Sequence, residues 1–189
     1  NTGALEFSMK TNTTSDAATL VINSDYTDGN DIVADAVART ATVTATSIES
    51  LTVQSTGKMA TITPVTGYKA DVVTNTLALI DTALTTLTVT GDKALSFTSG
   101  AGMVKLATVD ASANTGGATI DVSAAATDGT AAALTIKGSA TAANSLVGSG
   151  NADVIVGGSG NDTITGGAKG DTLTGNGGKD TFVFATGDS

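Results

Sequence analysis

Residues 148–183 read GSGNADVIV GGSGNDTIT GGAKGDTLT GNGGKDTFV, which are four consecutive units of nine residues. Self-similarity at a short fixed period is the signature of a repeat architecture. The sixth residue of every unit is an aspartate and the eighth is a large apolar residue. These are Asp153, Asp162, Asp171 and Asp180, and Ile155, Ile164, Leu173 and Phe182. Both series keep their step without slippage, which predicts a regular β-structured repeat rather than a chance similarity.

Each unit reads as a glycine-rich turn followed by a strand of three residues. Glycine and asparagine tolerate the positive φ of tight turns, so Asn151 fits a turn position otherwise held by glycine. The eighth residue points inward and its neighbours outward, because side chains alternate along a strand. A flexible linker is the alternative, but a linker has no reason to keep an inward apolar residue in register.

The aspartates are expected to form two columns. One unit makes half a turn of a coil, so a rung closes every two units and brings Asp153 over Asp171, and Asp162 over Asp180, about 4.8 Å apart. At an effective dielectric near 20, two carboxylates about 5 Å apart repel by on the order of 3 kcal/mol. A divalent cation turns this repulsion into attraction. Oxygen ligands from carboxylates and turn carbonyls suit Ca²⁺.

The units resemble the RTX nonapeptide G-G-x-G-x-D-x-U-x, the hemolysin-type calcium-binding repeat of bacterial proteins exported by type I secretion. GGSGNDTIT at 157–165 matches every defined position. Ser149 and Asn176 replace the second glycine of their units, and Asn151 and Lys169 replace the fourth. The resemblance implies a parallel β-roll with Ca²⁺ as its cofactor.

The resemblance also implies the metal ligands. In this family each ion lies between two stacked turns and takes carbonyl oxygens and one aspartate from each. Two ions are expected, with a third above them where Asn144 takes the aspartate's place. The first set is Ser149, Asn151, Asp153, Gly166, Ala168 and Asp171; the second is Gly158, Gly160, Asp162, Gly175, Gly177 and Asp180; the third is Ala140, Ala142, Asn144, Gly157, Ser159 and Asp162.

A second motif, apolar-x-x-Leu-x-Val, recurs upstream of the nines. It occurs at 48–53 and 84–89, and in the variant LATVDA at 106–111, 22 residues after the second copy. That spacing suits one rung of a parallel solenoid. Further strands are expected at 95–97, 119–122 and 134–136, where Thr or Asp alternates with aliphatic residues. An antiparallel sandwich also uses short strands, but these strands run without a linker into a repeat that is itself a solenoid.

The expected fold is therefore all-β, a right-handed parallel β-helix or β-solenoid that continues into a C-terminal calcium-binding RTX β-roll. Two domains are predicted, a Thr/Ala/Gly-rich solenoid with irregular rungs at 1–137 and the roll at 138–189. The structure of 64–86 stays open, because Leu77, Ile80 and Leu84 have helical spacing within strand-like text. The acidic stretch Asp25–Asp35 is either a solvated turn or a further calcium loop; it lacks the pattern of an EF-hand.

Composition excludes several classes of function. The 189 residues include 16 Asp, 2 Glu, 8 Lys and 1 Arg, with a formal charge of −9, and no Cys or His. A Ser-His-Asp triad, a cysteine nucleophile, a zinc site and a haem site all lack their residues, so no enzyme is expected. The acidic balance argues against a nucleic-acid partner. No apolar run approaches the roughly 18 residues of a membrane span.

Three functions fit the sequence. Residues 84–189, including VDASANTGGATIDVSA at 109–124, resemble the C-terminal regions of bacterial surface-layer (S-layer) proteins exported by type I systems. This implies an extracellular, self-assembling homo-oligomer in a lattice or filament at the bacterial cell surface, with a cell-surface glycan as a further partner. The second function is the accessory calcium domain of a secreted enzyme. The third is an adhesin, or an ice- or glycan-binding module, that uses outward threonines such as Thr163 and Thr165.

Overall fold

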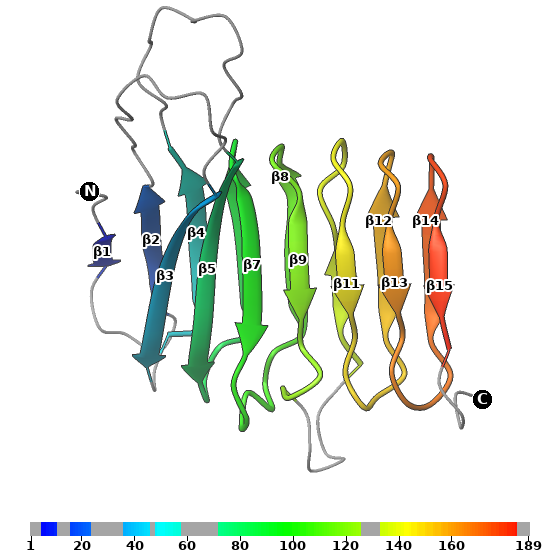
Figure 1. Cartoon of the computed structure of the whole chain (residues 1–189). Helices are drawn as coiled ribbons and strands as arrows, with labels where there is room; N and C mark the ends of the chain where they lie inside the picture. Colours follow the sequence, from blue (N-terminus) through cyan, green and yellow to red (C-terminus); the bar gives the residue numbers. More distant parts are fainter. Residues whose placement is uncertain are drawn as a thin grey trace, which may run out of the picture.

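The computed structural model describes residues 5–10, 16–23, 36–45, 48–57, 72–125 and 133–184. In this part of the chain the regular structure consists of strands β1 to β15, which form two sheets and stand side by side as a row of rungs (Figure 1). The described residues contain no helix long and apolar enough to cross a membrane. The all-β fold predicted from composition and from the repeat is confirmed.

The first sheet contains eight strands in the order β1-β2-β4-β6-β8-β10-β12-β14. Their bounds are β1 (Leu5–Lys10), β2 (Ala17–Asn23), β4 (Ser50–Thr56), β6 (Thr86–Gly91), β8 (Thr108–Asn114), β10 (Thr135–Lys137), β12 (Val154–Gly158) and β14 (Thr172–Asn176). The second sheet contains β3 (Ala36–Ala45), β5 (Val72–Asp81), β7 (Ala94–Ser99), β9 (Ala118–Asp121), β11 (Ser145–Val147), β13 (Thr163–Thr165) and β15 (Thr181–Val183).

Successive strands from β2 onward alternate between the two sheets. Each pairs in parallel with the next strand of its own sheet, whereas β1 runs antiparallel beside β2. A parallel solenoid results, as the sequence predicts. Strands shorten along the rod, from ten residues in β3 and β5 to three in β15. The nine-residue units leave room only for short strands between their turns.

The recurring apolar motif forms the inner wall of the first sheet. Leu51 pairs with Leu87, and Leu87 pairs with Val109. The same inward column continues through Ile136 and Ile155 in the roll. All five side chains are buried in one hydrophobic cluster. The solenoid and the roll therefore share a continuous core. The predicted domain boundary at 137/138 follows β10, which pairs with strands on both sides. The boundary itself stays a prediction.

Phe97 is the largest fully buried side chain of the described core, where it lies between Leu77 and Ile120 on neighbouring strands. Phe97→Ala is expected to lower the free energy of unfolding by about 3–5 kcal/mol, because it removes an aromatic ring and leaves a cavity. Urea denaturation measures this loss. The outward neighbour Thr98 is the control, since Thr98→Ala should change stability by less than about 0.5 kcal/mol. Equal losses in both variants would contradict the inward placement of Phe97.

The sequence left open whether residues 64–86 contain a helix. Within this segment, residues 72–81 form strand β5 instead. Leu77 and Leu79 are buried whereas Ile80 is 41% exposed, which is the alternation of a strand. The apparent helical spacing arises because Leu84 belongs to the next corner of the coil. Strands expected at 95–97, 119–122 and 134–136 occur as β7, β9 and β10 with small shifts. Residues 64–71 and the stretch Asp25–Asp35 lie outside the described residues.

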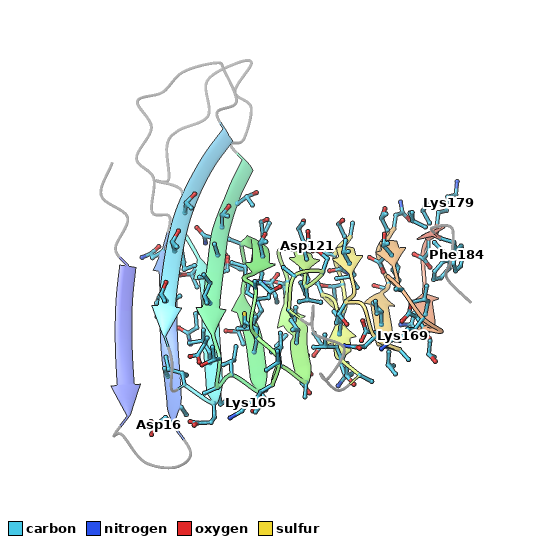
Figure 2. The ribbon with its side chains drawn as sticks, turned by 90° about the horizontal axis from the view of Figure 1, so that it is seen from below. Asp16, Lys105, Asp121, Lys169, Lys179 and Phe184 are labelled. Atoms are coloured by element: carbon cyan, nitrogen blue, oxygen red, sulfur yellow. The ribbon has the colours of Figure 1, made fainter. Side chains whose placement is uncertain are left out.

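The side chains of the last rung are more exposed to solvent than the repeat pattern predicts. Phe182 is expected to point into the core, yet it is 39% exposed, and Leu173 is only partly buried against the core. The reason is position: β14 and β15 end their sheets, so no further strand of the described chain covers them. Figure 2 shows Phe184 beyond this final rung. The inward prediction holds fully for Ile155 and Ile164, which have rungs on both sides.

Candidate metal centre

The two predicted aspartate columns are present. Val154 pairs with Thr172 and Thr163 pairs with Thr181, so the aspartate before each strand stacks on the aspartate of the next rung. Asp153 and Asp171 form one column, and Asp162 and Asp180 form the other. Each rung has two turns, and each column runs along one of them. Asn144 heads the second column because β11 pairs with β13, as predicted.

Asp153 and Asp162 each fold back and close their own turn. The backbone N–H of Ser149 donates to Asp153 Oδ2 at 2.6 Å, and the N–H of Gly158 donates to Asp162 Oδ2 at 2.6 Å. In both cases the donor is the second residue of the unit. These charge-assisted bonds are short, as expected for a carboxylate acceptor. The sixth position of the unit therefore needs a short side chain with an oxygen acceptor, whether or not an ion is bound.

The same carboxylates also tie neighbouring rungs together. Asp153 donates its backbone N–H to Asp171 Oδ1 at 2.8 Å, and Asp162 donates to Asp180 Oδ1 at 3.1 Å. The N–H of Asn144 donates to Asp162 Oδ1 at 2.8 Å. The columns are thus continuous ladders of carboxylates and amides along the axis of the roll.

Space explains why every unit begins with glycine. A Cβ at Gly157 would lie 2.2 Å from Asp162 Oδ2, and a Cβ at Gly166 would lie 2.2 Å from Asp171 Oδ2. Positive φ occurs instead at the second and fourth positions of the last two units, in Gly167, Lys169, Asn176 and Gly178. The glycine-rich turns therefore meet two requirements, space for the aspartate carboxylate and a positive φ. The sequence pattern indicated only the positive φ.

Gly157→Ala is expected to push the Asp162 carboxylate out of its turn and to weaken calcium binding by about tenfold or more, equivalent to about 1.4 kcal/mol. The added methyl group and the carboxylate cannot occupy the same space. Calorimetric titration with CaCl₂ measures the change. Gly170→Ala is the matched control, because a Cβ at Gly170 meets no atom within 4 Å. Unchanged affinity in Gly157→Ala would contradict the packing described for Asp162.

Two column carboxylates, those of Asp153 and Asp162, are buried and form no ion pair with the described residues. Asp153 and Asp162 are each 1% exposed. The ion pairs found in the described part are Lys93–Asp92 and Lys137–Asp110, both outside the columns. Burying a carboxylate is costly unless donors or a cation compensate its charge. The columns are therefore places where a cation would be strongly favoured.

Asp110 shows how a carboxylate is satisfied on the surface instead. It accepts hydrogen bonds from the Ser112 backbone N–H at 3.0 Å and hydroxyl at 2.6 Å, and from Lys137 at 3.3 Å. Burial alone would raise the pKa of Asp110, but these donors outweigh it and hold the pKa below its ordinary value. Asp153 and Asp162 have no corresponding ion pair among the described residues.

The donor set fits a hard cation. No group of three or more acidic side chains gathers in the part of the chain that the structure describes, so backbone carbonyls would complete any site. Carboxylate and carbonyl oxygens are the ligands that Ca²⁺ prefers. When bound, the ion would neutralise the columns and bridge successive rungs. The turns of each predicted set lie on neighbouring rungs, so residues of one set would hold the ion between them.

Several predicted carbonyl ligands already accept hydrogen bonds. Gly158 O accepts the N–H of Gly177 at 3.0 Å within the second set. Ala140 O accepts the N–H of Ser159, also at 3.0 Å, within the third set. The structure thus brings the turns of each set into direct contact. Coordination of an ion by the residues of the three sets stays a prediction.

Comparison with known families identifies the C-terminal segment. The family model of the RTX calcium-binding nonapeptide repeat (4 copies) matches residues 141–168, 147–182 and 156–189. Together with the parallel pairing of β10 to β15, the match establishes an RTX calcium-binding β-roll in this segment. No curated protein and no solved structure matches the chain.

Proposed function

We propose that the chain is an extracellular structural protein, a calcium-stabilised subunit of a surface layer or filament, exported by a type I system and without catalytic activity of its own. RTX calcium-binding repeats are typical of secreted bacterial proteins. The observation that carries the proposal is the continuity of both sheets. Strand β10 pairs with β8 and β12, and β11 pairs with β9 and β13. Calcium that orders the roll would therefore stiffen the whole rod.

Folding coupled to export gives this arrangement a purpose. Calcium is scarce in the cytoplasm, where the buried aspartates of the columns would repel one another and leave the roll loosely ordered. Outside the cell, calcium near the affinity of about 10⁻⁴–10⁻³ M usual for extracellular modules would order the roll. The ordered roll offers β10 and β11 as templates on which the preceding rungs can pair. The rod would thus become rigid along its whole length, including the roll, only after export.

The outward face of the second sheet supports a second candidate, an adhesin or glycan-binding module. One residue from each strand contributes a hydroxyl group to a single unbroken column. Its members are Thr40, Thr76, Ser96, Thr119, Ser145, Thr163 and Thr181. Neighbouring hydroxyls lie about 4.8 Å apart and each can donate and accept. Threonine is also a good strand former, so the column alone does not require a ligand.

Electron microscopy and light scattering of the full chain separate these candidates. Calcium at millimolar concentration is expected to produce ordered arrays or filaments, and a chelator or Asp162→Ala to prevent them. A chain that stays monomeric at every protein concentration with calcium present would contradict the structural role. Calcium-dependent binding of that monomer to a cell-surface polysaccharide would instead support the adhesin. Hydrolase activity of the full gene product would make the roll an accessory domain of an enzyme.

A further inference from the structure

We infer that calcium binds tightly at one of the three predicted positions, between turns 157–162 and 175–180, because side-chain donors of the protein take the ion's place at the other two. The inference rests on the proposed calcium binding and adds where the ion is held. It follows from four residues that depart from the repeat pattern, namely Asn144, Ser149, Asn151 and Lys169, which lie at the first and third predicted positions. The remaining departure, Asn176, lies at the second position, where its side chain is exposed.

Asn144 closes the third position. It stands where the nines have aspartate, and its side chain is nearly fully buried. Its Nδ2 donates to Asp162 Oδ1 at 2.9 Å and to the carbonyl of Ala142 at 3.0 Å, which are both predicted ligands of this position. The amide group thus makes the contacts that an ion would make there.

The oxygen of the same side chain is also engaged. Asn144 Oδ1 accepts the backbone N–H of Ser139 at 2.8 Å and that of Ala118 at 3.2 Å. The amide is therefore fixed with its NH₂ group toward the carboxylate and its oxygen toward backbone donors. An ion between turns 139–144 and 157–162 would have to displace these buried hydrogen bonds. Donors and acceptors left unpaired in this way would cost free energy.

Ser149 and Lys169 close the first position. Ser149 donates its hydroxyl to Asp153 Oδ2 at 2.9 Å, in addition to its backbone N–H, so the carboxylate is satisfied within its own turn. Lys169 Nζ donates to Asn151 Oδ1 at 2.9 Å and so bridges two stacked turns. A positive charge held beside the site opposes binding of a divalent cation.

The backbone at Lys169 supports a specific role for this side chain. Its φ of 70° lies in the left-handed region, where glycine is the usual residue and where the nonapeptide pattern has glycine. A lysine there carries a conformational cost, which its contact with Asn151 offsets. The contact forms between the fourth residues of two turns that stack on each other.

The second position lacks such donors at its glycine positions. Gly158 and Gly160 in the upper turn and Gly178 in the lower turn have no side chain to place between the turns. Lys179 is also part of this lower turn and is exposed, as Lys169 is, but it contacts the turn above through its backbone N–H, which donates to Asn161 Oδ1 at 2.8 Å. Figure 2 shows Lys169 and Lys179 at opposite edges of the roll. Asp162 accepts hydrogen bonds from Asn144 and Gly158, and Asp180 accepts one from the backbone N–H of Asp162. Among the described residues no side chain of turns 157–162 or 175–180 donates to either carboxylate, so the two are left to share an ion.

Calorimetric titration of the full chain with CaCl₂ tests the inference through its stoichiometry. Wild type is expected to bind one ion tightly. Asn144→Asp should add a second tight ion by restoring the carboxylate at the third position. Lys169→Asn should add one at the first position, because asparagine tolerates the positive φ but removes the charge, and affinity there should rise about tenfold.

Two variants serve as controls. Lys179→Asn removes the same charge from the neighbouring turn, and Lys169→Arg keeps the charge in place, so both should still bind one ion. Circular dichroism in calcium verifies that each variant is folded. Two or three equivalent tight ions in wild type, or a stoichiometry of one in both Asn144→Asp and Lys169→Asn, would overturn the inference. Absence of calcium binding in every protein would overturn the proposed function as well.

Discussion

Asp162→Ala is expected to destabilise the roll more than Asp153→Ala, and calcium is expected to create the difference. Both side chains are buried carboxylates that accept backbone N–H groups from two rungs. Without calcium, each variant leaves these donors unpaired, at a cost of about 1–3 kcal/mol for each buried group. Similar losses in stability are therefore expected for the two variants in a chelator.

In calcium the two variants should differ in stability, because Asp162 belongs to the second and third ligand sets, whereas Asp153 belongs to the first. At about 10 mM calcium and a Kd of about 10⁻⁴–10⁻³ M, one bound ion stabilises the folded state by about 1.4–2.7 kcal/mol. Asp162→Ala should lose this gain. Thermal unfolding with calcium and with chelator measures it, and the exposed Asp92→Ala is the control. An equal calcium response in Asp153→Ala and Asp162→Ala would contradict the assignment.

Removal of calcium is expected to loosen the roll while the middle of the solenoid stays ordered. Each rung contacts mainly its neighbours, so stability varies along the rod. Amide hydrogen exchange in β12 to β15 should accelerate by about 10- to 100-fold when about 10 mM calcium is replaced by chelator, since this is the factor by which the ion favours the folded state. Strands β6 and β8 have a fully buried apolar wall and no column aspartate, and they serve as the internal control.

The outcome that would count against this expectation is a uniform change. Equal acceleration in β6 and β12 would mean that calcium acts on the whole chain as one cooperative unit. No change in either strand would mean that hydrogen bonds of the carboxylates alone hold the roll. The second result would remove the physical basis for folding coupled to export.

Most of the roll could be predicted from the sequence because its geometry follows from period alone. The step of nine places Ile155 and Ile164 inward and pairs Asp162 with Asp180, and these relations depend on backbone repeat and side-chain alternation. The spacing of the upstream motif likewise predicted that Leu87 and Val109 lie one rung apart. The pairing of Leu51 with Leu87 is seen only in the structure. Periodic features need no knowledge of distant contacts.

Features that depend on neighbours could not be predicted in the same way. Residues 72–81 had apolar spacing compatible with a helix, and only pairing of β5 with β3 and β7 decided for a strand. Phe182 follows the pattern of a core residue, yet it is exposed because no further strand of the described residues pairs with β15. An apolar sequence pattern therefore predicts burial better for a repeat in the middle of a rod than for one at its end.

The contacts of Asn144 and Lys169 depend on side-chain placement, which the sequence did not indicate. Their departures from the nonapeptide pattern were visible, and Asn144 was expected to take the place of an aspartate as a metal ligand. The structure instead presents its NH₂ group to Asp162. The glycine that begins each unit was likewise explained by turn conformation, whereas at Gly157 it is the Asp162 carboxylate that leaves no space for a side chain.

The central claim is that stacked aspartates from successive rungs are held together by calcium. Diffraction from crystals grown at millimolar calcium, with the anomalous signal of the ion, tests it most directly. The account predicts parallel rungs with an anomalous peak between the turns 157–162 and 175–180, bound by Asp162 and Asp180. Aspartate columns without a peak at that concentration, or antiparallel strands in this segment, would contradict it.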